Sequence, residues 1–358
     1  MKLRNIFIIG SGYLAKSIVT ELSGSGVITH ANIFIFSRNF NNSNWLCTIG
    51  NVRSSIYMNS VKFHPEIIDW NSSNYLVDKI NELRPGLVIN TSSLQSMWSL
   101  NLKNKWSDLI LKTGYGLTLP LQYYIANKVA NSISSSVNPP IFINCCYPDC
   151  VNYLLKKKGH NIYSGIGNIG IIELVLSGII LKSQEYKMLA THYHVQELMK
   201  DEKERIHFPK LFFNGEECQD SSQIFRKITL VNNHFINSIT SSHCIKLMDI
   251  ILNEKSCTLH LPGPNGLIGG FPVTISKGLI TLIGAGISSL EKEEIWNRNT
   301  LSNEGLVFQE DKVCFSDLTY NSLVKVSHDL AVGFDYADID YYVDEFIGLK
   351  KTLLLFSN

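Results

Sequence analysis

The sequence predicts an α/β fold in which a doubly wound parallel sheet fills the N-terminal half and an α+β region follows. Short apolar runs alternate with helix-like segments up to residue 165, which is typical of parallel strands joined by right-handed crossovers. After that point the alternation stops, and strands and helices follow in irregular order. Because 358 residues exceed one typical domain, we expect two domains, at residues 1–165 and 166–358.

The first element is an apolar strand, Leu3 to Ile9, that runs into a small-residue turn. The turn reads Gly10, Ser11, Gly12, Tyr13, Leu14 and Ala15. In a dinucleotide-binding unit of the Rossmann type, the first glycine allows the tight turn and the second lets the backbone approach a pyrophosphate. The following helix, from about Gly12 to Leu22, points its N-terminal amides at the phosphates. We therefore predict that Gly10 to Leu14 bind a dinucleotide; the alternative is a Rossmann-like turn without a phosphate ligand.

The end of the second strand, Ile33 to Phe36, indicates which dinucleotide is bound. A site for NAD usually has a carboxylate here that binds both ribose hydroxyls, whereas a site for NADP needs neutral or cationic groups near the 2′-phosphate. This strand is followed by Ser37, Arg38 and Asn39, and an arginine can pair with a phosphate through two hydrogen bonds. We therefore expect these residues to bind NADP. NAD is the alternative, with Arg38 as an ordinary exposed residue.

The remaining elements of the sheet domain follow from apolar runs and helix signals. A polar connector, Asn39 to Asn44, and a less regular segment to Met58 precede the third strand. We expect further strands at Val61 to His64, Leu87 to Asn90, Ile141 to Cys145 and Ile162 to Gly165. We expect one helix with its N-cap at Ser72 or Ser73 and its end at Leu83. Three further helices are expected at Lys105 to Thr113, Leu119 to Ser132 and Tyr147 to Lys158. Such apolar strands suit a parallel sheet that is covered on both faces.

The second domain is expected to be α+β and to bind the substrate. Its predicted helices are Ile169 to Leu181, Ile236 to Leu252 and Tyr341 to Ser357, the last a candidate contact between two copies of a homodimer. Its predicted strands are Tyr186 to Tyr193, Leu211 to Phe213, Thr258 to Leu261 and Phe271 to Ile275. The charged run Glu197 to Arg205 indicates a solvated helix face or a mobile loop. The turn-rich segment Gly263 to Pro272 is either a loop that closes over a ligand or a plain hairpin connection.

Composition excludes several classes of protein. Hydrophobic residues make up 45% and charged residues 18% of the chain, which is typical of a compact globular protein. A net charge of +1 gives no electrostatic reason to expect nucleic acid or an anionic membrane as partner. The N-terminal apolar run is too short for a signal peptide, and no segment reaches the roughly 18 apolar residues that span a bilayer. We therefore expect a cytoplasmic protein.

The eight cysteines are scattered and form no C-x-x-C pair, so we interpret them as reduced, mostly buried thiols. Cys145, Cys146 and Cys150 lie close together, but no histidine or second cysteine cluster stands at metal-ligand spacing. No metal site is predicted.

Polar residues after the fourth and fifth strands mark the expected ligand-binding edge, because open α/β sheets bind ligands at the carboxyl ends of their strands. Thr91 and Ser92, after the fourth strand, and Asn144, at the end of the fifth, are predicted to contact the cofactor. The other possible role of Asn144 is to cap the helix that follows. Three nearby residues are predicted to line the substrate pocket: Gln95, Trp98 and Tyr147. A tryptophan at this place is equally compatible with a packed surface anchor.

These features resemble two families of oxidoreductases over roughly residues 1 to 195. The region with Asn144, Pro148-Asp149, the segment Gly165 to Asn168 and the acid Glu173 is similar to the lactate and malate dehydrogenase type. The region from Val61 to Ser92, with its Pro-x-Leu-Val-Ile-Asn strand, is similar to saccharopine-type reductases. Both resemblances imply hydride transfer to or from a nicotinamide.

The dehydrogenase resemblance implies a carboxylate that orients a histidine, which exchanges a proton with the substrate oxygen. By position, Glu173 would be the carboxylate and His194, or else His192, the acid/base. Alternate residues of a strand share a face, so both histidines of the segment Thr191 to His194 would point into one cleft. The alternative is that both are ordinary histidines of a strand, without a catalytic role. That family also clamps an α-carboxylate with an arginine shortly after the acid, and here Leu174 to Ser177 contain none, which argues against a simple 2-hydroxy acid substrate.

The function predicted from these observations is an NADP-dependent oxidoreductase that acts on a carbonyl or imine of a small metabolite, in a biosynthetic pathway. Two alternatives remain. One is a dinucleotide-binding sensor or regulatory protein without turnover. The other is a non-redox enzyme, such as a cyclase or epimerase, that holds NAD(P) tightly.

Overall fold

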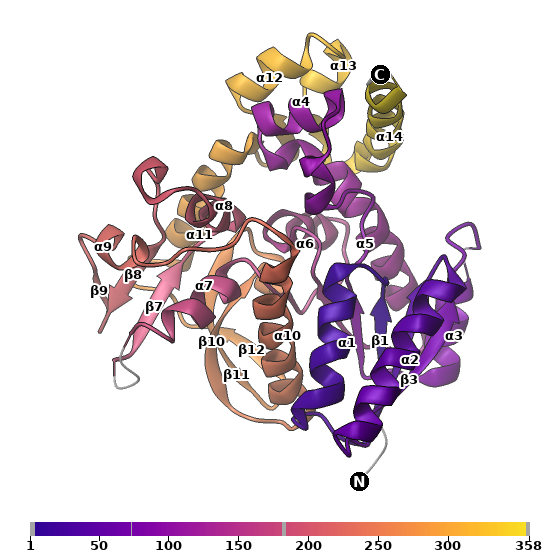
Figure 1. Ribbon diagram of the computed structural model, residues 1–358. Helices are drawn as coiled ribbons and strands as arrows, with labels where there is room; N and C mark the ends of the chain where they lie inside the picture. The colour runs from indigo at the N-terminus through magenta and orange to yellow at the C-terminus, as the bar shows by residue number, and fades with distance from the viewer. Residues whose placement is uncertain (1–3, 73, 181–183, 356–358) are drawn as a thin grey trace.

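The computed structural model describes residues 4–72, 74–180 and 184–355 (Figure 1). Its N-terminal part is a six-stranded parallel sheet with strand order β3-β2-β1-β4-β5-β6, which confirms the predicted doubly wound arrangement. The strands are β1 (Arg4–Ile9), β2 (Ala31–Ser37), β3 (Lys62–Ile67), β4 (Leu87–Asn90), β5 (Ile141–Asn144) and β6 (Ser164–Gly165). The sixth strand is shorter than expected. Ile9 pairs with Phe36 on one side and with Asn90 on the other, so the turn after β1 opens at the carboxyl edge of the sheet.

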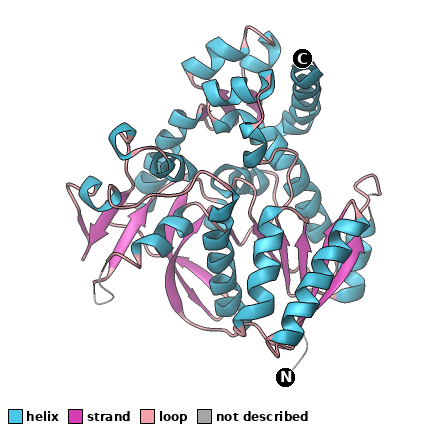
Figure 2. Cartoon of the chain, in the orientation of Figure 1, coloured by secondary structure: helices cyan, strands magenta, loops and turns pink. Residues whose placement is uncertain are grey.

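Helices cover both faces of this sheet (Figure 2). They are α1 (Tyr13–Ser25), α2 (Phe40–Ile56), α3 (Tyr75–Leu83), α5 (Leu119–Ser134) and α6 (Pro148–Lys157). Helix α4 (Lys105–Thr113) lies apart from the sheet, at the top of the molecule in Figure 1. Successive residues of β1 point to opposite faces, so Ile6 and Ile8 join one apolar core, and Phe7 and Ile9 join another. This two-sided burial explains why the strands are apolar throughout rather than alternating.

The prediction of an irregular segment from Asn39 to Met58 is wrong, because α2 occupies it. Asn39 is the N-cap, and its side chain accepts a hydrogen bond from the backbone N–H of Asn42 at 3.3 Å. The buried face of this helix includes the small residues Ser43, Gly50 and Ser54. A Cβ on Gly50 would lie 2.6 Å from the Phe63 ring, so close packing on β3 requires the missing side chain. The helical period is hidden because small residues carry it.

Two other boundaries differ from the sequence prediction. Helix α3 begins at Tyr75, with Asn74 at its N-cap, rather than after Ser72; Ser73 lies outside the described residues. The helix predicted from Ile169 to Leu181 is shorter in the structure, where α7 covers Ile169–Leu176; Leu181 lies outside the described residues.

The second half is α+β, as predicted, and contains three small antiparallel sheets. Their strands are β7 (Tyr186–Leu189), β8 (Lys210–Phe213) and β9 (Glu216–Glu217); β10 (Cys257–Pro262), β11 (Gly270–Ser276) and β12 (Leu279–Leu282); and β13 (Leu306–Phe308), β14 (Lys312–Phe315) and β15 (Phe334–Asp335). The helices here are α7, α8 (His192–Met199), α9 (Ser222–Phe225), α10 (Asn237–Leu252), α11 (Leu290–Thr300), α12 (Asp317–Leu323), α13 (His328–Ala331) and α14 (Ile339–Leu355). Within the segment Gly263 to Pro272, the residues from Gly263 to Gly269 form a hairpin connection between β10 and β11, and the last three belong to β11.

The predicted strand from Tyr186 to Tyr193 is only half correct. Strand β7 ends at Leu189, and α8 begins at His192. Thr191 and His194 form a capping box in which Nδ1 of His194 accepts from the Thr191 backbone N–H at 3.0 Å. Such a cap satisfies the free amides of a helix start, so the chain turns into a helix here. The two histidines therefore do not share a strand face.

The charged run after α8 is not simply solvated. Glu197 is fully buried and accepts from the Ile206 backbone N–H at 3.0 Å. Arg205 is 2% exposed and donates to the Ile228 carbonyl at 2.5 Å. Glu197 thus satisfies a backbone amide of the loop between α8 and β8, and Arg205 satisfies a carbonyl of the segment after α9, which explains their burial.

The C-terminal elements return to the sheet domain. Helix α14 packs on α5, and α12 packs on α4, at the top of the molecule in Figure 1. Phe346 of α14 belongs to the same apolar core as Phe7 of β1, so the expected boundary at residue 165 separates regions that share a core. No helix among the described residues is long and apolar enough to cross a bilayer.

Candidate functional site

Two cavities meet at the turn after β1 and form one cleft along the carboxyl edge of the sheet. The first has a volume of about 450 Å³ and lies over the ends of β1 and β2. The second, about 460 Å³, extends from the turn toward α8 and α10. Gly12 and Ser92 line both cavities. The cleft can therefore hold an elongated ligand that passes over the glycine turn.

The turn itself fits a pyrophosphate. Gly10 has φ 124°, and a Cβ there would lie 2.5 Å from Oγ1 of Thr91, so only glycine fits. Gly12 is the N-cap of α1, with no side-chain cap and with open space where its Cβ would be. The backbone amides at the start of this 13-residue helix thus face the cleft and have no side-chain cap, so they are available to bind an anion.

The first cavity has the groups predicted at the end of β2. Ser37, Arg38 and Asn39 all line it. The Ser37 hydroxyl lies 2.9 Å from that of Ser11 and accepts from the Asn39 backbone N–H at 3.2 Å, which ties the end of β2 to the turn. No carboxylate occurs among the described residues that line this cavity. A 2′-phosphate would therefore meet Arg38 without a repelling acid.

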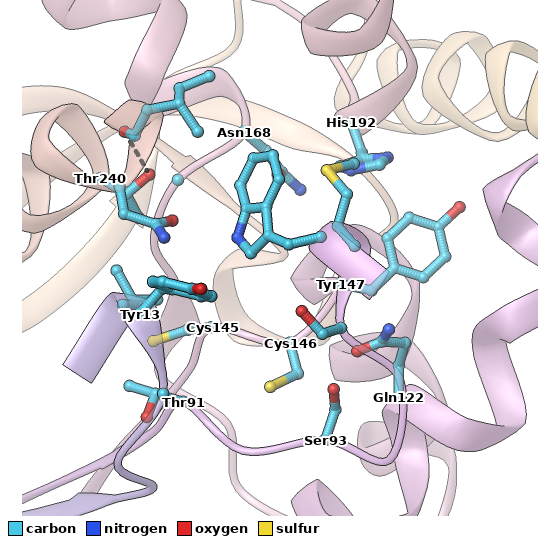
Figure 3. A pocket seen from close by; sticks show the side chains of 18 of the residues that line it. Tyr13, Thr91, Ser93, Gln122, Cys145, Cys146, Tyr147, Asn168, His192 and Thr240 are labelled. Atoms are coloured by element: carbon cyan, nitrogen blue, oxygen red, sulfur yellow. Dashed lines mark hydrogen bonds between the residues drawn. The ribbon is translucent and has the colours of Figure 1, made fainter. Parts of the chain in front are cut away.

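His192 lies in the wall of the second cavity (Figure 3), where a buried carboxylate holds it. Nδ1 of His192 lies 2.5 Å from Oε1 of Glu304, and the Glu304 side chain is fully buried. The other Glu304 oxygen accepts from the Tyr147 hydroxyl at 2.9 Å. With Nδ1 engaged, Nε2 is the ring atom left for a ligand, and it makes no hydrogen bond within the described part of the chain.

The Glu304 pair changes the acidity of His192. Burial alone would lower the pKa of His192, but the negative charge and hydrogen bond of Glu304 outweigh it and raise the pKa above its ordinary value. The His192 backbone N–H also donates to Oδ2 of Asp149 at 2.5 Å. Burial raises the pKa of Asp149 to about 6. The imidazole is thus poised to carry a proton near neutral pH.

Local packing explains how these groups meet. His192 is the first residue of α8, and Glu304 ends a short 3-10 helix, Leu301–Glu304, just before Gly305 at φ 92°. A Cβ on Gly114 would lie 2.4 Å from the Glu304 carbonyl oxygen, so the segment before α5 packs directly on the backbone of Glu304. The Tyr115 ring lies 4.9 Å from the His192 ring, centroid to centroid, and packs against it.

The other two residues predicted for catalysis lie elsewhere. The expected pairing of Glu173 with His192 or His194 is absent from the described residues, because Glu173 binds His260 and Lys246 instead. His194 caps its own helix and stacks on Trp296, 5.4 Å between ring centroids, on the opposite side from the cleft. Burial lowers the pKa of His194 to about 3, so it is neutral at physiological pH. The structure brings only His192 of the three to the cavity.

The remaining predicted residues divide into two groups. Gly12, Tyr13, Leu14, Thr91, Ser92, Gln95, Trp98 and Tyr147 line the second cavity, and Gly10, Ser11 and Gly12 line the first. Asn144 does not line either cavity. It is fully buried, and its amide binds the backbone of Cys146 and the side chains of Asn90 and Asn152.

Gln95 and Asn144 thus serve mainly to hold the loops that follow β4 and β5. The Gln95 amide oxygen accepts from Trp106 Nε1 at 2.9 Å, and its NH₂ group donates to the Ser96 carbonyl and the Ser99 hydroxyl. No group of three or more histidine, cysteine, aspartate or glutamate side chains suited to a metal ion occurs among the described residues.

Sequence reasoning missed Glu304, which lies 112 residues from His192. It also missed Asn168, whose φ is 46°, and Gln122, whose NH₂ group donates to the Tyr115 hydroxyl at 2.7 Å. No local signal identifies Glu304, since only the tertiary fold places it at the cleft. For Asn168, a signal existed in the run Gly165 to Asn168, where small and turn-forming residues precede a helix.

Comparisons with known proteins identify the fold. No protein-family model and no curated protein matches the sequence. Among solved structures, the malate dehydrogenase of Cryptosporidium parvum is 15% identical, with a TM-score of 0.54 over 85% of this chain and 97% of that one. The lactate dehydrogenase of the same organism, complexed with lactic acid and nicotinamide adenine dinucleotide, is 13% identical, with a TM-score of 0.53 over 85% and 97%.

A malate dehydrogenase from Aeropyrum pernix is also similar, at 13% identity and a TM-score of 0.54 over 84% of this chain and 96% of that one. The chain therefore has the fold of the lactate and malate dehydrogenases, an N-terminal Rossmann domain followed by a C-terminal domain, as the sequence resemblance implied. The resemblance to saccharopine-type reductases stays a prediction.

Proposed function

We propose that the protein is a nicotinamide-dependent oxidoreductase that transfers a hydride to or from a small carbonyl or imine compound. The observation that carries this proposal is the position of His192, held at Nδ1 by Glu304 and turned toward the cavity beyond the glycine turn. The likeness to dehydrogenases supports it at the level of fold.

The chain's own groups divide the work of such a reaction. The turn from Gly10 to Leu14 and the start of α1 bind the pyrophosphate, and the residues after β2 bind the adenosine end. When bound, the dinucleotide supplies or accepts the hydride. His192 gives a proton to the substrate oxygen from Nε2, or takes it back in the reverse direction, and Glu304 stabilises the charged imidazole.

Within this proposal the cofactor is NADP rather than NAD. The support is Arg38, together with the lack of a carboxylate among the described residues that line the first cavity. The similar structures favour NAD where their names state a cofactor, as for the lactate dehydrogenase from Cryptosporidium parvum. The choice of NADP over NAD therefore depends on Arg38.

Cofactor binding and turnover test the proposal together. Titration with NADPH and NADH, followed by fluorescence, should show binding of both and tighter binding of NADPH. A panel of aldehydes, ketones and imines should then contain members that oxidise the bound NADPH, seen as loss of absorbance of the reduced nicotinamide. Binding without oxidation by any member would contradict the enzyme and favour a dinucleotide sensor.

Arg38→Ala tests the cofactor choice. We expect about a 10-fold loss of NADPH affinity, since one hydrogen bond to a charged group is lost, and little change for NADH. Lys62→Ala is the matched control, because Lys62 is an exposed cation at the opposite, amino-terminal end of its strand. Tighter NADH binding that is unaffected by Arg38→Ala would overturn the NADP assignment.

A further inference from the structure

The second cavity lacks a counter-charge for an acidic substrate. Among the described residues that line it, none is a lysine or arginine. Its one basic side chain is His192, whose positive charge is already balanced by Glu304 at 2.5 Å. A carboxylate that entered this space would leave water without gaining a cationic partner, which is strongly unfavourable.

Much of the wall is apolar instead. Its apolar side chains include Met97, Trp98, Ile171, Val195, Met199 and Ile236. They come from the segment after β4, from α7, from α8 and from the approach to α10. Such a lining suits the hydrocarbon or aromatic body of a ligand.

Two buried amide groups in the same cavity have no protein partner. Nδ2 of Asn168 and Nδ2 of Asn237 are buried and make no hydrogen bond within the described chain, and their residues are 7% and 8% exposed. Both residues line the cavity. Buried N–H donors normally have acceptors, so these two indicate a ligand that brings oxygen atoms.

Asn168 is the better placed of the two. Its backbone has φ 46° and ψ −114°, a conformation that costs energy for any residue with a side chain. Its side chain lies beside Asp149, where it offsets part of the rise in the pKa of that carboxyl that burial causes, and Oδ2 of Asp149 also accepts from the backbone N–H of His192. A primary amide has two N–H donors, so proximity to Asp149 leaves one for a ligand beside His192.

We propose that the substrate is an uncharged carbonyl compound with an apolar or aromatic body, and that Asn168 and His192 together bind its reacting oxygen. This inference rests on the proposed function and specifies its substrate class. In the reductive direction, the carbonyl carbon gains a hydride from the dihydronicotinamide, its oxygen gains a proton from Nε2 of His192, and the dinucleotide is oxidised. Asn168 donates to that oxygen throughout and neither gains nor loses a proton.

A matched pair of substrates tests the inference in the native enzyme. Methyl benzoylformate and benzoylformate share one skeleton and differ in the charge next to the ketone, and ethyl pyruvate and pyruvate form a smaller pair. We expect kcat/KM with NADPH to favour each neutral ester over its acid by about 100-fold, the loss expected when a buried charge has no partner. Equal values, or preference for the acids, would overturn the inference and leave the oxidoreductase intact. Bound NADPH with no reduction of any member would count against the proposed function itself.

Asn168→Gly tests the binding role of the amide. Glycine adopts a positive φ without strain, so the melting temperature should stay the same or rise, while kcat/KM for methyl benzoylformate falls about 10-fold. Asn214→Gly is the matched control, since Asn214 also has a positive φ, of 51°, but is exposed in the turn between β8 and β9. Unchanged kcat/KM in Asn168→Gly would show that the amide does not bind substrate. A lower melting temperature with unchanged preference for the ester would assign it a structural role.

Discussion

Among the described residues, two buried glutamate–histidine pairs can be compared, and one of them, Glu304 with His192, faces the cleft. Glu304 and His192 meet in the wall of the cleft, and Nε2 of His192 is left for a ligand. Glu173 and His260 meet between α7 and β10, where Nζ of Lys246 also donates to Glu173 at 2.6 Å. Nε2 of His260 is engaged as well, since it accepts from the Met188 backbone N–H at 3.0 Å.

The difference shows that a buried acid beside a histidine does not by itself indicate catalysis. In the Glu173 cluster, burial would raise the pKa of the acid, but the hydrogen bond of His260 and the charge of Lys246 lower it. All of those groups bind one another, so the cluster stabilises the fold. In the Glu304 pair, one ring nitrogen stays available, and the same type of contact can serve chemistry.

The largest expected effect comes from removal of the imidazole at the cleft. His192→Asn should lower kcat by about 10²- to 10⁴-fold, the contribution of a general acid or base, with NADPH affinity unchanged. His260→Asn is the matched change in the other pair and should lower the melting temperature but leave kcat near that of the wild type. Stopped-flow hydride transfer and fluorescence titration measure the two quantities. Turnover at the wild-type rate in His192→Asn would show that the two pairs do not differ in their part in catalysis.

A smaller effect is expected when the acid at the cleft loses its charge. Glu304→Gln should lower kcat for carbonyl reduction by about 10- to 100-fold, because the protonated imidazole is less stabilised. Glu304 raises the pKa of His192, and reduction needs the protonated ring. Activity should therefore fall as pH rises through that pKa, and this fall should move to lower pH in the variant. An identical pH profile in both proteins would separate Glu304 from the acidity of His192.

The Glu173 cluster should instead respond in stability. Glu173→Gln should lower the free energy of unfolding by about 2 kcal/mol at neutral pH, a typical value for hydrogen bonds to a charged group. The folded state lowers the pKa of Glu173 below its ordinary value of 4.5, so this stabilisation is present above pH 4.5 and is lost as pH falls. Urea unfolding at pH 7 and pH 4 should show the difference shrink on acidification. A deficit that grows at pH 4 would contradict the assignment.

The smallest effect concerns the hydroxyl that supports Glu304. Tyr147→Phe removes the 2.9 Å hydrogen bond to Oε2 of Glu304 and keeps the ring that packs on His192. The hydroxyl acts on His192 through Glu304, so only part of the roughly 1.5 to 3 kcal/mol of a hydrogen bond to a charged group should be lost in the reaction, and kcat should fall about 5-fold. Tyr153→Phe, on the following helix and outside the cleft, is the control. A loss as large as that of His192→Asn would give the Tyr147 hydroxyl a direct part in proton transfer.

The sequence predicted the sheet and the glycine turn because these depend on local patterns. Apolar runs identify β1, β2, β4 and β5, and the run from Gly10 to Ala15 follows directly from β1. Helix α2 escaped prediction because small residues, rather than large apolar ones, make up most of its buried face beside Leu46 and Cys47. The capping box of Thr191 and His194 lies in a stretch whose sequence also suits a strand. This stretch is helical because of the cap and of its packing in the folded protein.

The candidate site was predictable only in part, for a different reason. Residues that follow β1, β2 and β4 could be placed at the cleft from the order of strands alone. Glu304 could not, because it comes from the C-terminal region and reaches His192 only through the packing of the segment before α5 against its backbone. Glu173 stood at the position that the dehydrogenase resemblance implied, but its side chain is bound by His260 and Lys246.

The most direct test is a crystal structure of the protein with NADPH and a neutral substrate analogue. We expect the pyrophosphate at Gly12 and the nicotinamide in the cavity lined by His192, with Nε2 of His192 within about 3 to 3.5 Å of the analogue's oxygen, the near-attack range. Glu304 should still be bound to Nδ1. A nicotinamide outside this cavity, or a His192 ring turned away from the analogue, would be incompatible with His192 as the acid/base.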